Sequence, residues 1–129
     1  MKRILVAEDD TASRDLLTRI LGFYGFATLR ATNGRQAIQI TKQSPPDLIM
    51  MDVSMPIQNG LDAVRELKQR AELAHIPVVA MSAYDSRQDQ IDALNAGCVA
   101  FFPKPLELFR LKEELNQIID VHRLQYSAS

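Results

Sequence analysis

The chain has 129 residues, of which 47% are hydrophobic, and its 15 basic and 16 acidic side chains leave a formal net charge of -1. This length allows one domain with a full core but not two. The near balance of charge disfavours a nucleic-acid surface, which usually carries a basic stripe. Cys98 is the single cysteine, so an intrachain disulfide is excluded and a reducing compartment is expected.

No apolar run approaches the length that a membrane span needs. The apolar stretch at residues 4–7 follows Met1-Lys-Arg directly and is too short for the core of a signal peptide. We therefore expect a soluble, cytoplasmic protein.

Short apolar segments alternate with helical patterns along the chain. The predicted strands cover residues 4–7, 27–31, 48–52, 77–82 and 99–102, and the second of these is half polar, as an edge strand would be. A helical pattern follows each strand, beginning near residues 11, 34, 61, 85 and 108. Gly22 and Gly25 are expected to end the first helix, and Gly97 the fourth. The predicted domain spans residues 1–124, and residues 125–129 are expected to form a frayed tail.

This alternation is typical of right-handed βαβ units stacked into one parallel sheet with helices on both faces. In such a doubly wound sheet, ligands bind beyond the carboxyl ends of the strands. Several polar side chains follow the predicted strands directly: Glu8, Asp9 and Asp10 after the first, Asp52 after the third, Ser82 after the fourth, and Lys104 after the fifth. We expect them to share one rim of the sheet.

Asp52 directly follows four apolar residues, which is typical of a strand buried on both faces, and Pro56 prevents the strand from continuing. A carboxylate so close to the core costs several kcal/mol unless it is paired or bound to a metal. Two carboxylates about 6 Å apart repel by roughly 3 kcal/mol at an effective dielectric constant of about 20. Lys104 alone cannot balance the acids of this rim, which indicates a bound cation.

Carboxylate oxygens without nearby histidine or cysteine favour Mg²⁺, or Mn²⁺, over zinc. A divalent ion beside a partly exposed carboxylate indicates phosphoryl transfer with aspartate as the nucleophile. In that chemistry Lys104 would neutralise phosphoryl oxygens, and Ser82 could donate a hydrogen bond to one of them.

These residues together resemble the receiver domain of response regulators in two-component signalling. The family pattern is an acidic pair after strand one, a phosphoacceptor aspartate followed by Met-Pro and Gly, Ser or Thr with Ala after strand four, and Lys-Pro after strand five. The chain has Glu8-Asp9, Asp52 with Met55-Pro56 and Gly60, Ser82-Ala83, and Lys104-Pro105. The resemblance extends from residue 4 to about residue 123.

The resemblance implies a five-stranded, doubly wound α/β fold of flavodoxin-like order 2-1-3-4-5, with five helices on two faces. It implies that Asp52 accepts a phosphoryl group from a histidine kinase or a phosphotransfer protein, and that Lys104, before a cis peptide bond, pairs with phosphoryl oxygens. Asp9, Asp52 and the backbone carbonyl of Ser54 would bind Mg²⁺ directly, and Glu8 through a water molecule.

Activation in the family couples two further positions. Here Ser82 and Phe101 occupy them, and Phe101 lacks the hydroxyl of the tyrosine that is common at its position. The surface of the fourth helix, fifth strand and fifth helix would then bind a downstream protein. Ser54 and Tyr84 flank the pocket and would tune hydrolysis. A stand-alone regulator and the receiver of a hybrid kinase both fit.

Simpler interpretations of the same residues stay open. The acids after the first strand could cap a helix, for which Asp10 is the best candidate, and Ser82 could begin one. Lys104 could be a solvated surface residue. The face of the fourth helix with Asp85, Asp89 and Asp92 could be solvated or bind a partner. His75 and His122 are expected to lie far apart, and Cys98 to be a partly buried apolar residue.

Three other functions compete with the switch, which would not be an enzyme for an external substrate. A phosphatase of the haloacid-dehalogenase type requires a second aspartate, its general acid, two residues after the nucleophile, where this chain has Ser54. A flavodoxin wants a hydroxyl-rich phosphate loop where this chain has three consecutive acids. A receiver that binds partners without phosphorylation is disfavoured because each expected site residue is present.

Overall fold

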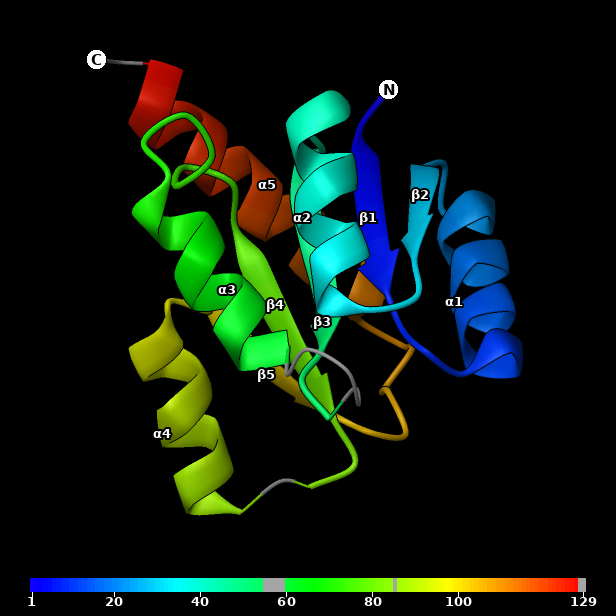
Figure 1. Cartoon of the computed structure of the whole chain (residues 1–129). Helices are drawn as coiled ribbons and strands as arrows, with labels where there is room; N and C mark the ends of the chain where they lie inside the picture. Colours follow the sequence, from blue (N-terminus) through cyan, green and yellow to red (C-terminus); the bar gives the residue numbers. More distant parts are fainter. Residues whose placement is uncertain (55–59, 85, 128–129) are drawn as a thin grey trace.

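The structure is a computed structural model that describes residues 1–54, 60–84 and 86–127. Within these residues five strands alternate with five helices (Figure 1). In chain order they are β1 (Arg3–Ala7), α1 (Thr11–Phe23), β2 (Ala27–Ala31), α2 (Gly34–Gln43), β3 (Leu48–Asp52), α3 (Gly60–Gln69), β4 (Val78–Ser82), α4 (Arg87–Ala96), β5 (Ala100–Pro103) and α5 (Leu111–Ser127). The motif residues Met55 and Pro56, and also Asp85, lie outside the described residues.

The strands form one parallel sheet in the order β2-β1-β3-β4-β5, which confirms the predicted fold. The half-polar β2 is an edge strand, as expected. Every residue of β3 and β4 is buried, because helices cover these strands on both faces. The order of the strands reverses between β1 and β3, which is where doubly wound sheets bind their ligands.

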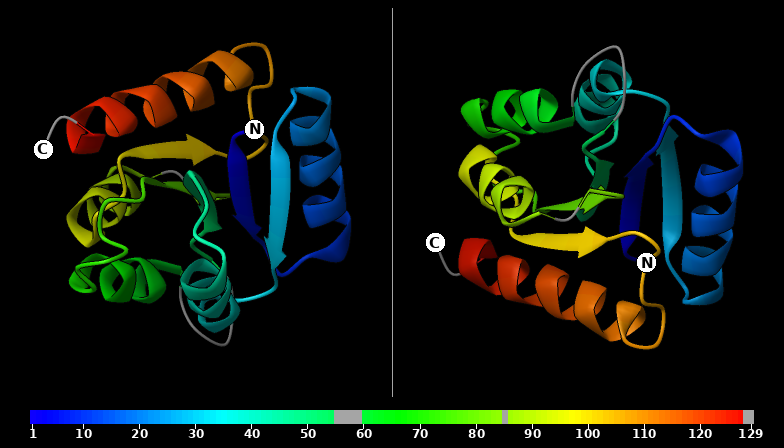
Figure 2. Two further views of the ribbon diagram at one scale, coloured as in Figure 1. Left: turned by 90° about the horizontal axis from the view of Figure 1, so that it is seen from above. Right: turned by 90° about the horizontal axis from the view of Figure 1, so that it is seen from below.

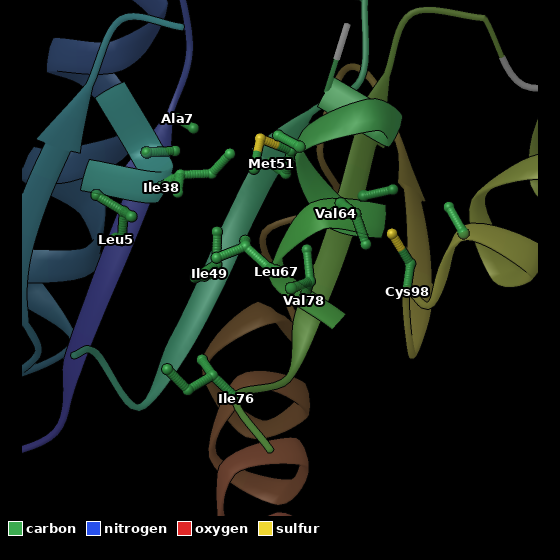
Figure 3. Packing of buried hydrophobic residues seen from close by; sticks show 14 of the residues in the cluster. Leu5, Ala7, Ile38, Ile49, Met51, Val64, Leu67, Ile76, Val78 and Cys98 are labelled. Carbon is green, nitrogen blue, oxygen red and sulfur yellow. The ribbon is translucent and has the colours of Figure 1, made fainter. Parts of the chain in front are cut away.

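Successive side chains of each strand point to opposite faces and build two separate cores. One core joins alternate strand residues to α2, α3 and α4, and Figure 3 shows Leu5, Ile49 and Val78 of the strands against Ile38, Val64 and Leu67 of the helices. The other core joins the intervening strand residues to α1 and α5. Figure 2 shows α5 across the sheet from α2, α3 and α4.

Strand register brings the polar residues of the rim to one level. Ala7 pairs with Met51, so that Glu8, the residue after β1, lies level with Asp52, the last residue of β3. Ser82 pairs with Pro103, and the backbone N–H of Lys104 donates to the Ser82 carbonyl at 2.8 Å. The predicted shared rim therefore exists.

Gly60 allows α3 to begin directly against this rim. A Cβ atom at this position would lie 2.5 Å from the carbonyl oxygen of Asp52 and 2.7 Å from the Cα of Val53. Both contacts are with backbone, which cannot move aside as a flexible side chain could. The glycine of the family pattern therefore has a steric reason in this chain.

Several element ends differ from the prediction. α1 continues through Gly22 to Phe23, and the positive φ of +93° at Gly25 makes the turn into β2. α4 begins later than expected, because Ser86 and Asp89 form a reciprocal capping box. α5 begins at Leu111 and reaches Ser127, since no glycine or proline interrupts the region predicted to be the tail.

Two expectations for single side chains were wrong. Cys98 is buried in the core and not partly buried, and burial raises the pKa of its thiol to about 11. His75 and His122 are not far apart, since both line one pocket of about 550 Å³ at the amino ends of β3 and β4. The last turns of α5 reach the loop before β4, and sequence spacing does not reveal that contact. Among the described residues, none of the helices has the length and hydrophobicity needed to cross a bilayer.

Candidate phosphoacceptor site

Asp52 ends β3 with a carboxylate that is almost completely buried and fully engaged. Its residue is 3% exposed. Oδ1 accepts hydrogen bonds from the backbone N–H of Ser54 at 2.9 Å and from the Ser54 hydroxyl at 2.7 Å. Oδ2 accepts a hydrogen bond from the Lys104 ammonium group at 2.9 Å. Asp52 therefore has the partners that a carboxylate in this position requires.

Lys104 bridges two acids and is not a solvated surface lysine. Its Nζ atom lies 2.6 Å from Oε1 of Glu8 and 2.9 Å from Oδ2 of Asp52. Burial by itself would lower the pKa of Lys104, but the two carboxylates outweigh it and raise the pKa. The Lys104–Pro105 peptide bond is cis, as the resemblance implies.

Glu8 and Asp9 complete an acidic cluster with Asp52. One carboxylate oxygen from each residue lies within 4.8 Å of the others. Glu8 is buried and Asp9 is exposed. Burial, and then the neighbouring Asp52, raise the pKa of Glu8 to about 7, and Lys104 only partly opposes the shift. The pKa of Asp52 shifts in the opposite direction. Burial by itself would raise it, but hydrogen bonds with Glu8, Lys104 and Ser54 outweigh burial and lower it.

This donor set fits a hard divalent cation. Three carboxylates converge here, Lys104 pairs with two of them, and the cluster contains oxygen ligands alone. Such ligands suit Mg²⁺ or Mn²⁺. Within the part of the chain that the structure describes, no other group of three acidic, histidine or cysteine side chains comes as close together.

Asp10 is separate from the cluster and caps α1. Its carboxylate accepts a hydrogen bond from the backbone N–H of Ser13 at 2.8 Å. Hydrogen bonding with the side chain and then with the backbone of Ser13 lowers the pKa of Asp10. Of the three consecutive acids, one therefore serves the helix and two face Asp52.

Ser82 and Phe101 lie on the neighbouring strands β4 and β5. Ser82 is 2% exposed, and its hydroxyl accepts the backbone N–H of Tyr84 at 3.0 Å. It does not cap α4, whose N-cap is Ser86. Phe101 pairs with Ala80 of β4 and packs, partly buried, against the core of α2, α3 and α4.

Sequence reasoning missed Arg14. Its Nη1 atom donates to the backbone carbonyl of Glu8 at 2.8 Å and lies 3.5 Å from the carbonyl of Asp9. The available signal was a cation in the first turn of a helix, where the positive end of the helix dipole disfavours it.

Comparison with known proteins identifies the family. The family model of the response regulator receiver domain matches residues 4–116. The chain belongs to this family. This receiver is 31% identical over 118 residues to the polar-differentiation response regulator DivK of Brucella anthropi, covering 92% of this chain and 96% of that protein.

Two solved structures show the same fold. A response regulator receiver domain protein of Methanospirillum hungatei has a TM-score of 0.89 and 24% identity, with 97% of this chain and 98% of that chain covered. The receiver domain of a sensor histidine kinase of Pseudomonas aeruginosa has a TM-score of 0.79 and 25% identity, with 92% and 93% covered. That crystal structure contains a magnesium ion coordinated in the active-site cleft.

Proposed function

We propose that Asp52 accepts a phosphoryl group from a histidine kinase or a phosphotransfer protein, and that this modification switches the surface formed by α4, β5 and α5 between two states. The observation that carries the proposal is the ammonium group of Lys104, which lies within 2.9 Å of both Glu8 and Asp52 at the switch point of the sheet. A cation in that position is suited to neutralise the oxygens of an incoming phosphoryl group.

The transfer itself needs few protein groups. A carboxylate oxygen of Asp52 attacks phosphorus, an O–P bond forms, and the P–N bond of the donor phosphohistidine breaks, leaving the electron pair on the imidazole nitrogen. Ser54 orients the Asp52 carboxylate through two hydrogen bonds to Oδ1. Lys104 already lies beside Oδ2 and stays to pair with the phosphoryl oxygens.

The same rim provides ligands for Mg²⁺, or Mn²⁺. Asp9, Asp52 and the backbone carbonyl of Ser54 would hold the ion directly, and Glu8 through a water molecule. A bound ion would supply the positive charge that Lys104 alone cannot, and so offset the negative charge of carboxylates and phosphate. The magnesium ion in the related Pseudomonas aeruginosa receiver supports this assignment.

Ser82 and Phe101 would transmit the modification. The Ser82 hydroxyl accepts a hydrogen bond from the loop at Tyr84. Turning toward a phosphoryl oxygen would break that bond and release the loop that precedes α4. Phe101, which is packed against the core beside Ala80, would then move further inward. Ser54 and Tyr84 are expected to affect the rate at which the acyl phosphate is hydrolysed.

The proposed output surface exposes apolar side chains that a protein partner could cover. They are distributed over α4, the residue that precedes β5, and α5: Ile91, Leu94, Val99, Val121 and Leu124. Leu94 is 54% exposed and Leu124 70%. Exposed apolar side chains of this kind favour protein contacts over nucleic acid or membrane.

The proposed switch needs only the domain predicted for residues 1–124, so it could act as a stand-alone cytoplasmic regulator or within a hybrid kinase. The switch would catalyse its own phosphorylation and dephosphorylation and act on no external substrate.

The experiment that tests the proposal exposes the protein to acetyl phosphate with Mg²⁺ and locates the added phosphoryl group by mass spectrometry after borohydride trapping. We expect the wild-type protein to be modified at Asp52 and Asp52→Asn to stay unmodified. Asp10→Asn is the matched control, because Asp10 lies on the same rim but caps α1. Modification at another residue would overturn the assignment.

A further inference from the structure

Arg14 occupies a position in α1 that is unfavourable for a cation. It lies in the first turn, and its backbone N–H makes the first hydrogen bond of the helix, to the Asp10 carbonyl at 2.9 Å. The positive end of the helix dipole repels a guanidinium group there. A residue in such a place needs acceptors that compensate for the repulsion.

Those acceptors are backbone carbonyls of the acidic pair. Nη1 of Arg14 donates to the Glu8 carbonyl at 2.8 Å and lies 3.5 Å from that of Asp9. β1 ends at Ala7, so the next carbonyls leave the ladder and need other donors. The side chain of Arg14 thus folds back over the turn between β1 and α1.

The contact fixes the backbone carbonyls of Glu8 and Asp9, and with them the directions in which the two side chains project. Glu8 is buried and its carboxylate is held by Lys104. Asp9 is exposed, so burial does not restrict its carboxylate. The place of Asp9 beside Asp52 therefore follows from the backbone of the turn, which Arg14 holds. Both contacts come from Nη1, whose N–H bonds lie in the fixed plane of the guanidinium group. The N–H bonds of a lysine ammonium group rotate and would fix the two carbonyls less well.

We propose that Arg14 is a positioning residue that holds the backbone of the Glu8–Asp9 turn so that both carboxylates face Asp52. The inference rests on the proposed function, in which this acidic pair holds Mg²⁺. Groups that orient metal ligands without touching the metal typically contribute about 10- to 100-fold to metal affinity.

The test is the Mg²⁺ dissociation constant, measured by isothermal titration calorimetry on the unphosphorylated full chain. We expect Arg14→Gln to weaken Mg²⁺ binding about tenfold, with Arg14→Lys intermediate. Arg19→Gln is the matched control, because it removes the same charge from an exposed position of the same helix. It should leave the affinity close to that of the wild type.

The direction of the change in Mg²⁺ affinity distinguishes a positioning role of Arg14 from a purely electrostatic one. If Arg14 acted only as a nearby positive charge, its removal would strengthen the binding of a cation. Unchanged or tighter binding by Arg14→Gln, with normal binding by the wild type, would overturn the inference and leave the proposed function intact. A wild type that binds no Mg²⁺ would instead overturn the proposed function.

Melting temperatures without metal exclude a general loss of structure. We expect Arg14→Gln to melt within about 2 °C of the wild type in the absence of Mg²⁺, because loss of the contact is offset by relief of the dipole repulsion. Should Arg14→Gln fail to fold, Arg14→Lys decides: weaker Mg²⁺ binding by that folded variant supports the inference, and wild-type affinity overturns it.

Discussion

Glu8 and Asp52 show how two carboxylates bridged by one lysine acquire different properties. Burial raises the pKa of Glu8 to about 7, whereas hydrogen bonds with Glu8, Lys104 and Ser54 lower that of Asp52. A nucleophilic carboxylate must be ionised, and the lowered pKa keeps Asp52 in that form. When two titratable groups are driven apart in this way, their environments indicate which of them can act as the nucleophile.

Thr41 offers a test of buried polar groups at the residue scale. It is fully buried in α2, and its hydroxyl has no hydrogen-bond partner among the described residues. A buried hydroxyl without a partner costs about 1–3 kcal/mol. We expect Thr41→Val to leave the free energy of unfolding unchanged or to raise it by about 1 kcal/mol, as measured by urea denaturation.

Thr18 provides the control for that substitution. Its hydroxyl is also buried, but it donates to the Arg14 carbonyl at 2.9 Å and accepts from Arg30 at 2.9 Å. Thr18→Val should therefore lower the free energy of unfolding by about 1–2 kcal/mol. Equal destabilisation by both variants would show that Thr41 has a partner after all.

At the scale of elements, Asp47 joins α5 to the start of the sheet. Oδ1 accepts from the Arg123 guanidinium at 2.8 Å, and Oδ2 from the backbone N–H of Arg3 at 2.7 Å. Partial burial would raise the pKa of Asp47, but these two hydrogen bonds outweigh it and hold the pKa below the ordinary value of 3.8. A carboxylate with a lowered pKa in the folded state stabilises the fold above its unfolded pKa, and loses that effect as the pH falls through the folded pKa.

We therefore expect Asp47→Asn to lower the free energy of unfolding at neutral pH by about 1 kcal/mol. The difference from the wild type should disappear in strongly acidic solution, where Asp47 is protonated. Urea denaturation over a pH series measures both effects.

Asp62→Asn is a suitable control, since its ion pair with Arg65 is exposed within α3 and should contribute little. A difference between wild type and Asp47→Asn that persisted unchanged in acid would contradict the electrostatic explanation.

At the scale of the whole molecule, the acidic cluster connects ion binding to global stability. A ligand that binds only the folded state at ten times its dissociation constant stabilises it by about 1.4 kcal/mol. For a domain of this size we expect Mg²⁺ at that concentration to raise the melting temperature by about 3–5 °C. Asp9→Ala should remove the gain, because it removes one of the three converging carboxylates.

Asp10→Asn should behave differently from Asp9→Ala. It alters the N-cap of α1, so its melting temperature without metal is the baseline for this variant, and it should keep the Mg²⁺-dependent gain. Scanning calorimetry with and without Mg²⁺ distinguishes the two variants. The absence of any shift in the wild type at millimolar Mg²⁺ would count strongly against the metal site.

The sequence predicted the sheet well because the apolar pattern of the strands and the roughly 3.6-residue pattern of the helices both depend on neighbouring residues. Four apolar residues before Asp52 indicate a strand buried on both faces, and a parallel sheet then brings the carboxyl ends of its strands to one edge. Glu8, Asp9 and Lys104 could therefore be assigned to the rim with Asp52 before any contact was known. Element ends were less accurate, since the capping box that begins α4 depends on local hydrogen bonds that compete with other arrangements.

The kinds of groups at the site, and the cation that suits them, were thus determined by the order of residues along the chain. Only the tertiary structure decided which of these groups form ion pairs and hydrogen bonds with one another. Lys104 bridges Glu8 and Asp52, Asp10 caps α1, and Arg14 folds back over the acidic turn. The physical reason is range. Periodicity and strand ends follow from neighbours in sequence, whereas distances of 3 Å between side chains 50 to 100 residues apart depend on packing, which no local pattern encodes.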